Sequence, residues 1–189
     1  MLHQALIELM AEKSFGAITV GDIAERATVN RATFYAHFTD KHALLEYTIR
    51  EMIQQRLHSR LPAGSSFNSE NLAVLILAVC EFLAEMNRQC PPPHGQMGPL
   101  MEKQIKAELY EILQAWVPDL RAGSTDHSPT TEQVAVVASW AIYGAAVQWS
   151  QQERPEPAER FVQQVLPLIL SGLQPVAQAA RPQAWPTAD

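Results

Sequence analysis

Proline- and glycine-rich breaks divide this chain into long segments whose apolar residues have helical spacing. The breaks lie at residues 61–66, 91–99, 118–129 and 153–157. Proline and glycine interrupt regular structure. The segments between the breaks repeat apolar residues every three or four positions, with little of the strict alternation that is typical of strands. The sequence therefore predicts an all-α fold.

Polar side chains that can cap helices mark the predicted starts in the N-terminal third. Thr19, with Asp22 three residues further on, forms a variant of the capping box. Asn30 and Asp40 are good N-cap residues for the next two helices. We expect helices over about residues 2–13, 20–27, 31–37 and 41–59.

The remainder of the chain predicts four longer helices, over about residues 68–89, 100–117, 130–152 and 156–180. Thr130 and Gln133 have the spacing of a capping box. Pro167 lies inside the last segment, where it predicts a kink or a split because proline lacks the amide hydrogen that a helix interior needs. Residues 182–189 are expected to be a frayed tail.

The charge of the chain limits the partners that it can bind. The formal net charge is −6, from 14 Lys+Arg and 20 Asp+Glu, which excludes a basic coat for nucleic acid. Residues 1–60 carry seven basic and seven acidic side chains, and residues 61–189 carry seven basic and thirteen acidic. A local basic footprint in the N-terminal part remains compatible with this balance.

The compartment is expected to be the cytoplasm. Cys80 and Cys90 are too few for a disulfide scaffold, and the N-terminus has helical spacing rather than the pattern of a signal peptide. Apolar stretches are interrupted well before the length of a membrane span, so no membrane association is expected. A metal site is disfavoured because Cys90 and His94 are separated by a Pro-Pro-Pro run, and paired ligand motifs are missing.

Residues 19–41, TVGDIAERATVNRATFYAHFTDK, resemble the DNA-binding head of the TetR family of bacterial transcription regulators. The resemblance consists of T-V-x-D-I-A-x-x-A, of V-N-R-A-T-F-Y-A-H-F and of D-K-x-A-L-L at the fourth helix. A-L-x-E-L-M-A-E-K, at residues 5–13, fits the first helix of the family. The resemblance implies a helix-turn-helix domain over 1–46, a helical ligand-binding and dimerisation domain over 47–181, and a tail over 182–189.

The resemblance makes residues 30–37 the recognition helix that enters the major groove. Arg31 is the only long cationic donor on it and can pair with guanine or with a phosphate, although it could also be a solvated surface residue. Phe34 and Phe38 are expected in the core. The DNA contacts that we expect are Thr19, Asn30, Arg31, Ala32, Thr33, Tyr35, His37 and Lys41, of which Thr19, Tyr35, His37 and Lys41 are expected on phosphates.

Two residues depart from the pattern of the family. Ser14 and Thr28 stand where the family usually has glycine. A turn residue with positive φ is easily adopted by glycine and is disfavoured for a β-branched residue. We therefore expect that the turn at Thr28 either relaxes or carries strain. The chain also starts at the first helix, without the basic arm that family members often use on DNA, so we expect few phosphate contacts.

For the body, the resemblance implies an effector pocket and a dimer interface. The aromatic and methionine side chains could line such a pocket or simply fill the core; the candidates are Met86, Met101, Tyr110, Trp116, Trp140 and Tyr143. Small residues on one helix and apolar residues on the last could pair two subunits or pack within one subunit. The candidates for this interface are Ala138, Ala141, Gly144, Ala145, Phe161, Val165, Leu168 and Leu173.

The function predicted from this resemblance is that of a TetR-type regulator, most simply a repressor. It would bind a palindromic operator as a homodimer and leave it when a small-molecule effector occupies the body. The alternative is a TetR-like activator or co-activator controlled by a protein partner. No cofactor is expected, and no catalytic motif supports an enzyme.

Overall fold

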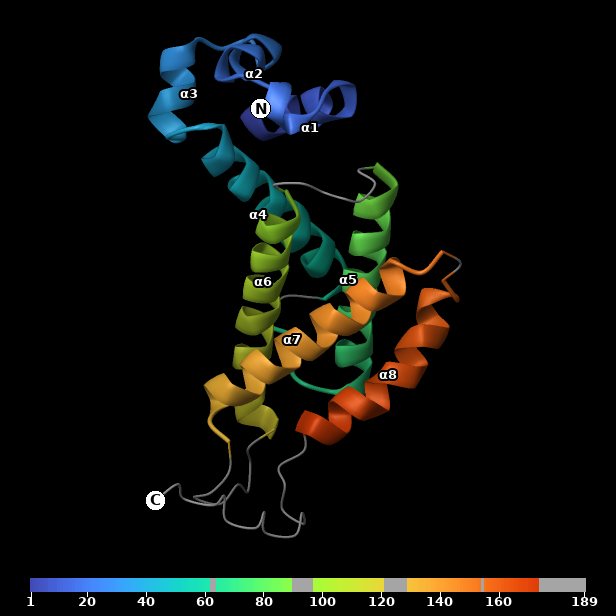
Figure 1. The fold of residues 1–189 in the computed structure, drawn as a ribbon. Helices are drawn as coiled ribbons and strands as arrows, with labels where there is room; N and C mark the ends of the chain where they lie inside the picture. Colours follow the sequence, from blue (N-terminus) through green and yellow to red (C-terminus); the bar gives the residue numbers. More distant parts are fainter. Residues whose placement is uncertain (62–63, 90–96, 121–128, 154, 174–189) are drawn as a thin grey trace, which may run out of the picture.

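The computed structural model describes residues 1–61, 64–89, 97–120, 129–153 and 155–173. These residues form eight α-helices and a short 3₁₀ turn, with no strand among them (Figure 1). The predicted all-α fold is confirmed. None of the helices in these ranges is long and apolar enough to span a membrane.

Three short helices form a head at the N-terminal end of the molecule (Figure 1). They are α1 (Leu2–Glu12), α2 (Val20–Arg26) and α3 (Arg31–His37), and the 3₁₀ turn η1 (Phe15–Ala17) joins the first two. Each contributes apolar side chains to one core, where Leu6, Ile23 and Phe34 are 0% exposed. The first turns of α4 (Lys41–Arg60) complete this core with Leu44, which is also 0% exposed.

The capping residues begin these helices where the sequence predicts. The hydroxyl of Thr19 accepts from the amide of Asp22 while the Asp22 carboxylate accepts from the amide of Thr19, which completes the capping box. The Asn30 side chain accepts from the amide of Thr33 at 2.7 Å. Asp40 accepts from the first amides of α4 in the same way. Each cap satisfies amides that a helix start would otherwise leave unbonded.

The body continues from α4 without a break in the helix. In the body α4 packs against α5 (Ser69–Gln89) and α6 (Met97–Leu120), and α7 (Thr131–Ser150) crosses both of these helices (Figure 1). α8 (Ala158–Leu173) lies against α5 and α7. The largest fully buried side chains of the core between them are aliphatic and include Leu75, Ile76, Ile105, Leu109 and Leu113.

The helix bounds differ from the predicted ones in α6 and α8. α6 begins at Met97 rather than near residue 100, because Pro99 is tolerated in the first turn of a helix. Of the kink or split that was predicted at Pro167, the split is wrong, because α8 continues through this residue. Pro167 is exposed, so solvent can reach the carbonyl that loses its hydrogen bond there. The capping box of α7, from Thr130 to Gln133, is confirmed.

Candidate DNA-binding site and helix groove

The turn between α2 and α3 sets how the recognition helix is presented. The amide of Thr28 donates to the carbonyl of Glu25 at 3.0 Å, and the amide of Val29 donates to the carbonyl of Ala24 at 2.9 Å. These two bonds form a Schellman motif, which requires a left-handed residue after the helix. Thr28 takes that position with a φ of 57°, so the turn does not relax and the strain is carried. Ser14 has an extended backbone, with a φ of −61°.

The side chains of α3 divide between the core and the solvent. Phe34 is buried and Phe38 is half-buried against it, with ring centroids 6.0 Å apart, which confirms that both belong to the core. Thr33 is half-buried at the edge of the core. The remaining predicted contacts of this helix are exposed: Asn30, Arg31, Ala32, Tyr35 and His37. The fold therefore leaves these side chains of α3 accessible from solvent.

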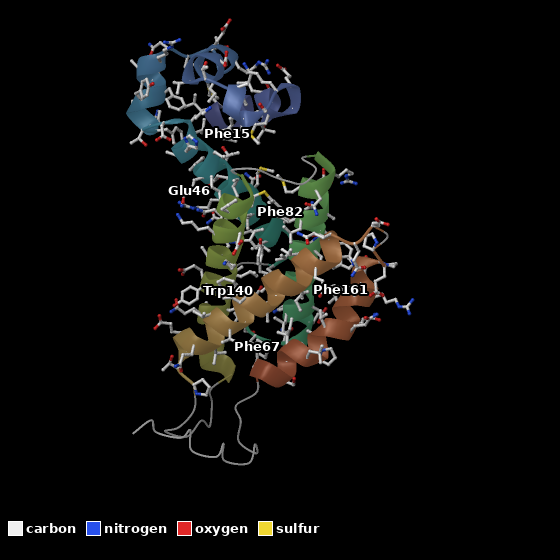
Figure 2. The ribbon with its side chains drawn as sticks, in the orientation of Figure 1. Phe15, Glu46, Phe67, Phe82, Trp140 and Phe161 are labelled. Carbon is white, nitrogen blue, oxygen red and sulfur yellow. The ribbon has the colours of Figure 1, made fainter. Side chains whose placement is uncertain are left out.

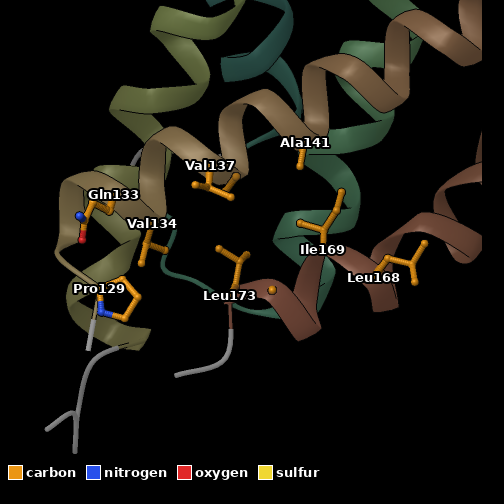
Figure 3. Close-up of a pocket in the computed structure, with 10 residues that line it drawn as sticks. Pro129, Gln133, Val134, Val137, Ala141, Leu168, Ile169 and Leu173 are labelled. Atoms are coloured by element: carbon orange, nitrogen blue, oxygen red, sulfur yellow. The ribbon is translucent and has the colours of Figure 1, made fainter. Parts of the chain in front are cut away.

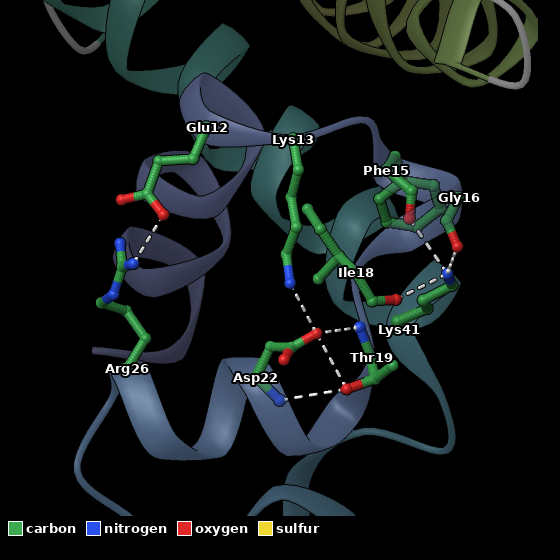
Figure 4. Close-up of polar contacts among 9 residues, drawn as sticks. All are labelled: Glu12, Lys13, Phe15, Gly16, Ile18, Thr19, Asp22, Arg26 and Lys41. Atoms are coloured by element: carbon green, nitrogen blue, oxygen red, sulfur yellow. Dashed lines mark hydrogen bonds and ion pairs between the residues drawn. The ribbon is translucent and has the colours of Figure 1, made fainter.

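Two of the cations in the head are already paired with acidic residues (Figure 4). Lys13 lies 2.9 Å from the carboxylate of Asp22, and Arg26 lies 2.8 Å from the carboxylate of Glu12. Hydrogen bonding from Lys13, and then from Thr19, lowers the pKa of Asp22 to about 2. The hydrogen bond from Arg26 likewise lowers the pKa of Glu12. Both pairs join α1 to α2, so they stabilise the head itself.

Lys41, which is predicted to contact a phosphate, has its ammonium group hydrogen-bonded within the head. Its ammonium group donates to the carbonyl oxygens of Phe15, Gly16 and Ile18 at 3.0, 3.1 and 2.7 Å (Figure 4). An ammonium group has three donors, and these three bonds use them all. Lys41 therefore closes η1 onto the start of α4. Sequence reasoning had no signal for this role, because the acceptors are backbone groups 23 to 26 residues away.

Thr19 is similarly occupied by the fold. Its hydroxyl donates to the Asp22 carboxylate at 2.9 Å and accepts from the Asp22 amide at 3.1 Å. A phosphate oxygen needs a donor, and the single hydroxyl proton of Thr19 is already given to Asp22. The capping box thus places Thr19 at the start of α2, and a phosphate contact from its hydroxyl would have to break the additional hydrogen bond to the Asp22 carboxylate.

Arg31 differs from the other cations of the head. It is exposed, and the described chain gives its guanidinium neither an ion pair nor a hydrogen-bond acceptor. Its guanidinium lies against Gly21 of α2, a contact that sequence reasoning missed. Arg31 is therefore the cation of residues 1–48 whose donors are free for DNA.

The body contains an open apolar groove of about 770 Å³ between α7 and α8 (Figure 3). Val134, Val137 and Ala141 line it from α7, and the side chains that face them from α8 are Leu168, Ile169 and Leu173. Gln133 is the polar side chain at its edge. None of the six predicted pocket residues lines this groove.

The structure separates the predicted pocket residues instead of bringing them together. Met86, Met101 and Trp116 are buried, so the alternative that they fill the core describes them correctly. The indole of Trp116 donates to the carbonyl of Ser65 at 2.6 Å. Tyr110 and Trp140 line a separate shallow groove between α6 and α7.

Trp140 occupies an exposed position beside α6 (Figure 2). The ammonium of Lys106 lies 3.3 Å from the centroid of its ring and 5.7 Å from that of Tyr143. Burial raises the pKa of Tyr143 to about 12, with Glu102 adding to the effect. These three side chains form a cation–aromatic cluster rather than the wall of an enclosed pocket.

The predicted interface residues also divide into two groups. Ala138 is buried within the subunit, and Phe161 stacks on Trp149 with ring centroids 6.1 Å apart. Leu173 is buried too, while Ala145 and Val165 are half-buried. Ala141, Gly144 and Leu168 are exposed. Ala138, Phe161 and Leu173 thus pack within the subunit.

Polar contacts join α4 to α6 where the head meets the body. Glu46 accepts from Lys103 and from Gln104, both at 2.7 Å, and the Gln104 side chain is 2% exposed. One and two turns further along α4, Arg50 donates to Gln104 at 3.3 Å and Gln54 donates to Glu108 at 2.9 Å. The hydrogen bond from Lys103 lowers the pKa of Glu46. These contacts couple the position of α4 to that of α6.

Cys80 is buried, and burial raises the pKa of its thiol to about 12. Within the described ranges no three His, Cys, Asp or Glu side chains come together as a metal site. Cys90 and His94, the pair that was considered for a metal site from the sequence, lie outside these ranges.

Known proteins resemble both parts of this chain. Residues 2–48 match the model of the bacterial regulatory proteins of the tetR family. YxbF of Bacillus subtilis (strain 168), an uncharacterized HTH-type transcriptional regulator, is 30% identical over 103 residues, which span 49% of this chain but only 27% of YxbF. The HTH-type transcriptional repressor DhaR of Mycobacterium sp. (strain GP1) is 23% identical, over 93% of this chain and 96% of DhaR.

Solved structures extend the likeness to the body. The transcriptional regulator FadR of Bacillus subtilis, solved in complex with stearoyl-CoA, superimposes with a TM-score of 0.59. It is 19% identical, and the match covers 90% of this chain and 97% of FadR. At this identity the likeness shows a common fold. These relatives are transcriptional regulators, a class without catalysis.

Proposed function

Since this chain belongs to the TetR family of bacterial regulatory proteins and is a transcriptional regulator, we propose that it is a repressor that binds a palindromic operator as a homodimer. A small-molecule effector would release it, and no catalysis is involved. The proposed head (1–46) and body (47–181) share α4. We propose that the protein acts in the cytoplasm, where bacterial DNA lies.

The exposed surface of α3 with the free guanidinium of Arg31 is the observation that carries the proposal. A recognition helix needs side chains that reach base edges. Arg31 is long enough to do so, and the small side chain of Ala32 lets the helix approach the groove. Because Lys13, Arg26 and Lys41 are already engaged, we expect few phosphate contacts and a shallow dependence of binding on salt.

We call the exposed surface of α7 and α8 around Val137, Ala141, Gly144 and Leu168 the α7–α8 face. The partner that we propose for this face is a second copy of the chain. α7 carries no charged residue after Glu132, and α8 carries none from Phe161 to Leu173. Even so, Val137 is 66% exposed and Leu168 is 70% exposed. An uncharged, apolar face of this kind on a protein with 20 acidic residues favours a protein contact over solvent. We propose that Val137, Ala141, Gly144 and Leu168 meet their counterparts across a two-fold axis.

The stearoyl-CoA complex of FadR supports a small-molecule effector for the body. An effector changes DNA binding only if it favours one arrangement of the two heads over another. The route that we propose is the polar contact between α4 and α6, because α4 belongs to the core of the head at Leu44 and to that of the body at Ile53.

The test begins with selection of duplexes from a random pool by the wild-type protein. We expect a palindrome to be enriched, with half-sites about one helical turn or a multiple of it apart. Arg31→Ala should then weaken binding to the enriched duplex by ~1–3 kcal/mol. Arg31→Ala should weaken binding to a scrambled duplex less. The control Arg160→Ala, in the body, should leave the affinities for both duplexes unchanged.

Equal losses on both duplexes would make Arg31 a phosphate contact without a role in sequence recognition. Failure to enrich any duplex would contradict the proposed function.

A further inference from the structure

The guanidinium of Arg31 packs on the backbone of α2 at a position that only glycine leaves open. Gly21 is the second residue of α2, and Arg31 is the first residue of α3. A Cβ atom at residue 21 would lie 2.6 Å from Nη2 of Arg31, 3.3 Å from its Cζ and 3.4 Å from its Nε. Three neighbouring guanidinium atoms thus surround the place where a side chain would begin. Any residue other than glycine would move the guanidinium.

The contact with Gly21 places the guanidinium beside the first turn of α2. Arg31 has no ion pair or hydrogen-bond acceptor in the described chain, so no polar partner determines its rotamer. Packing on Gly21 leaves its N–H donors free. Glycine is also a poor helix former, and alanine would suit the first turn of α2 better. A glycine at this position is therefore explained by the space that it leaves.

We propose that Gly21 is a positioning residue for Arg31 and thereby a determinant of DNA sequence preference. Gly21 holds the guanidinium between the starts of α2 and α3. From this position the guanidinium contacts the operator. Replacing Gly21 leaves the fold intact, because the displaced group is the end of a flexible side chain, but it moves the cation that reads DNA. The DNA part of this inference rests on the proposed function.

The first experiment needs no DNA. Gly21→Ala is compared with Gly16→Ala, a matched change in the same head, since a Cβ at Gly16 meets nothing within 4 Å. Nitrogen relaxation of the Arg31 Nε–H group reports the order of the guanidinium. We expect an ordered group in the wild type and in Gly16→Ala, and a mobile or shifted one in Gly21→Ala, with thermal melts alike. A wild-type Arg31 as mobile as that of Gly21→Ala would overturn the inference.

The second experiment is a double-mutant cycle on the duplex enriched by the wild-type protein. Gly21→Ala should weaken binding to this duplex about tenfold, within the range of one lost base contact, and affect a scrambled duplex much less. In the Arg31→Ala background the same change should have no effect, because the group that Gly21 positions is gone. Gly16→Ala should match the wild type throughout.

Two outcomes of the cycle would contradict the inference. An equal loss in both backgrounds would mean that the methyl group added in Gly21→Ala itself clashes with DNA. No loss in either background would mean that the location of the guanidinium does not matter. If the wild type enriches no duplex, the proposed function fails, whereas the relaxation experiment still decides whether Gly21 positions Arg31.

Discussion

Thr28 holds its backbone in a conformation that β-branched residues rarely adopt. Its φ of 57° lies in the left-handed region, where the Cβ atom approaches the following carbonyl oxygen. The hydrogen bonds of the Schellman motif and the packing of α2 against α3 keep the residue there. This strain lies in the turn that orients the recognition helix.

Thr28→Gly should therefore stabilise the protein by about 1 kcal/mol, the relieved strain exceeding the extra freedom of glycine in the unfolded chain. Chemical denaturation measures the free energy of unfolding. Ser14→Gly is the matched control, because Ser14 is extended and gains nothing from glycine. The free energy of unfolding of Ser14→Gly should be about 0.5–1 kcal/mol lower than that of the wild type. A loss of stability in Thr28→Gly would show that the turn carries no relievable strain.

Asp22 makes the stability of the head depend on acid pH. Its pKa is lowered from 3.8 to about 2 in the folded protein, chiefly by Lys13. A depressed pKa means that the ionised carboxylate stabilises the fold above pH 3.8, and that this contribution is lost as the pH falls toward 2. Thermal melts of wild type and Asp22→Asn should thus differ at neutral pH and converge between about pH 4 and pH 2.

Glu25→Gln on the same helix serves as the control, since Glu25 has no salt bridge in the described chain. Its melting temperature should stay close to that of the wild type over the whole range. A difference between wild type and Asp22→Asn that stays constant down to pH 2 would contradict the pairing with Lys13.

At the scale of elements, Lys41 joins η1 to α4 through three backbone carbonyls. Its chain also passes the ring of Phe15, with Nζ 4.8 Å from the ring centroid. The contact fixes the angle at which α4 leaves the head. The proposed transmission of effector binding from the body to the head needs such a rigid connection between η1 and α4.

Lys41→Ala should cost about 2 kcal/mol of stability, because the carbonyls lose hydrogen bonds from a charged donor. Denaturation measures this loss, and Lys13→Ala, which removes an exposed ion pair, should cost no more than about 1 kcal/mol. The slope of log K against log salt for DNA should stay unchanged in Lys41→Ala. A shallower slope with unchanged stability would restore the predicted phosphate contact.

For the whole molecule, the apolar face of α7 and α8 is the surface that we propose for the contact between two subunits. Gly144 lies on it, and a Cβ there would meet nothing within 4 Å in the isolated subunit. The single subunit therefore leaves room for a Cβ atom at this position. A second copy packed on the proposed contact would occupy that room.

Gly144→Leu should shift the protein toward monomer, since overpacking at a contact costs ~1–3 kcal/mol. Light scattering over a dilution series measures this shift, and operator affinity should fall in parallel while helicity stays unchanged. Ala115→Leu, at an exposed position of α6, is the matched control and should behave as the wild type. A Gly144→Leu protein that remains dimeric would exclude Gly144 from the subunit contact.

The sequence by itself determined the features that depend on neighbouring residues. The caps at Thr19, Asn30, Asp40 and Thr130 act over two or three positions, so local chemistry is enough to place the helix starts. The motifs of residues 19–41 identified the family for the same reason, because their spacing follows from one short helix-turn-helix. At Thr28 the pattern left two alternatives, a relaxed turn or a strained one, and the structure shows the strained one with a φ of 57°.

The tertiary structure decided which of several equivalent side chains meets which partner. Lys41 bonds carbonyls more than twenty residues away, and Arg31 rests on Gly21 of another helix. Ala138 is buried while Ala141, one turn along the same helix, is exposed, because the crossing of α7 over α5 and α6 sets which face is covered. Periodicity gives the faces of a helix but not its neighbours, so contacts between distant segments follow only from the packed fold.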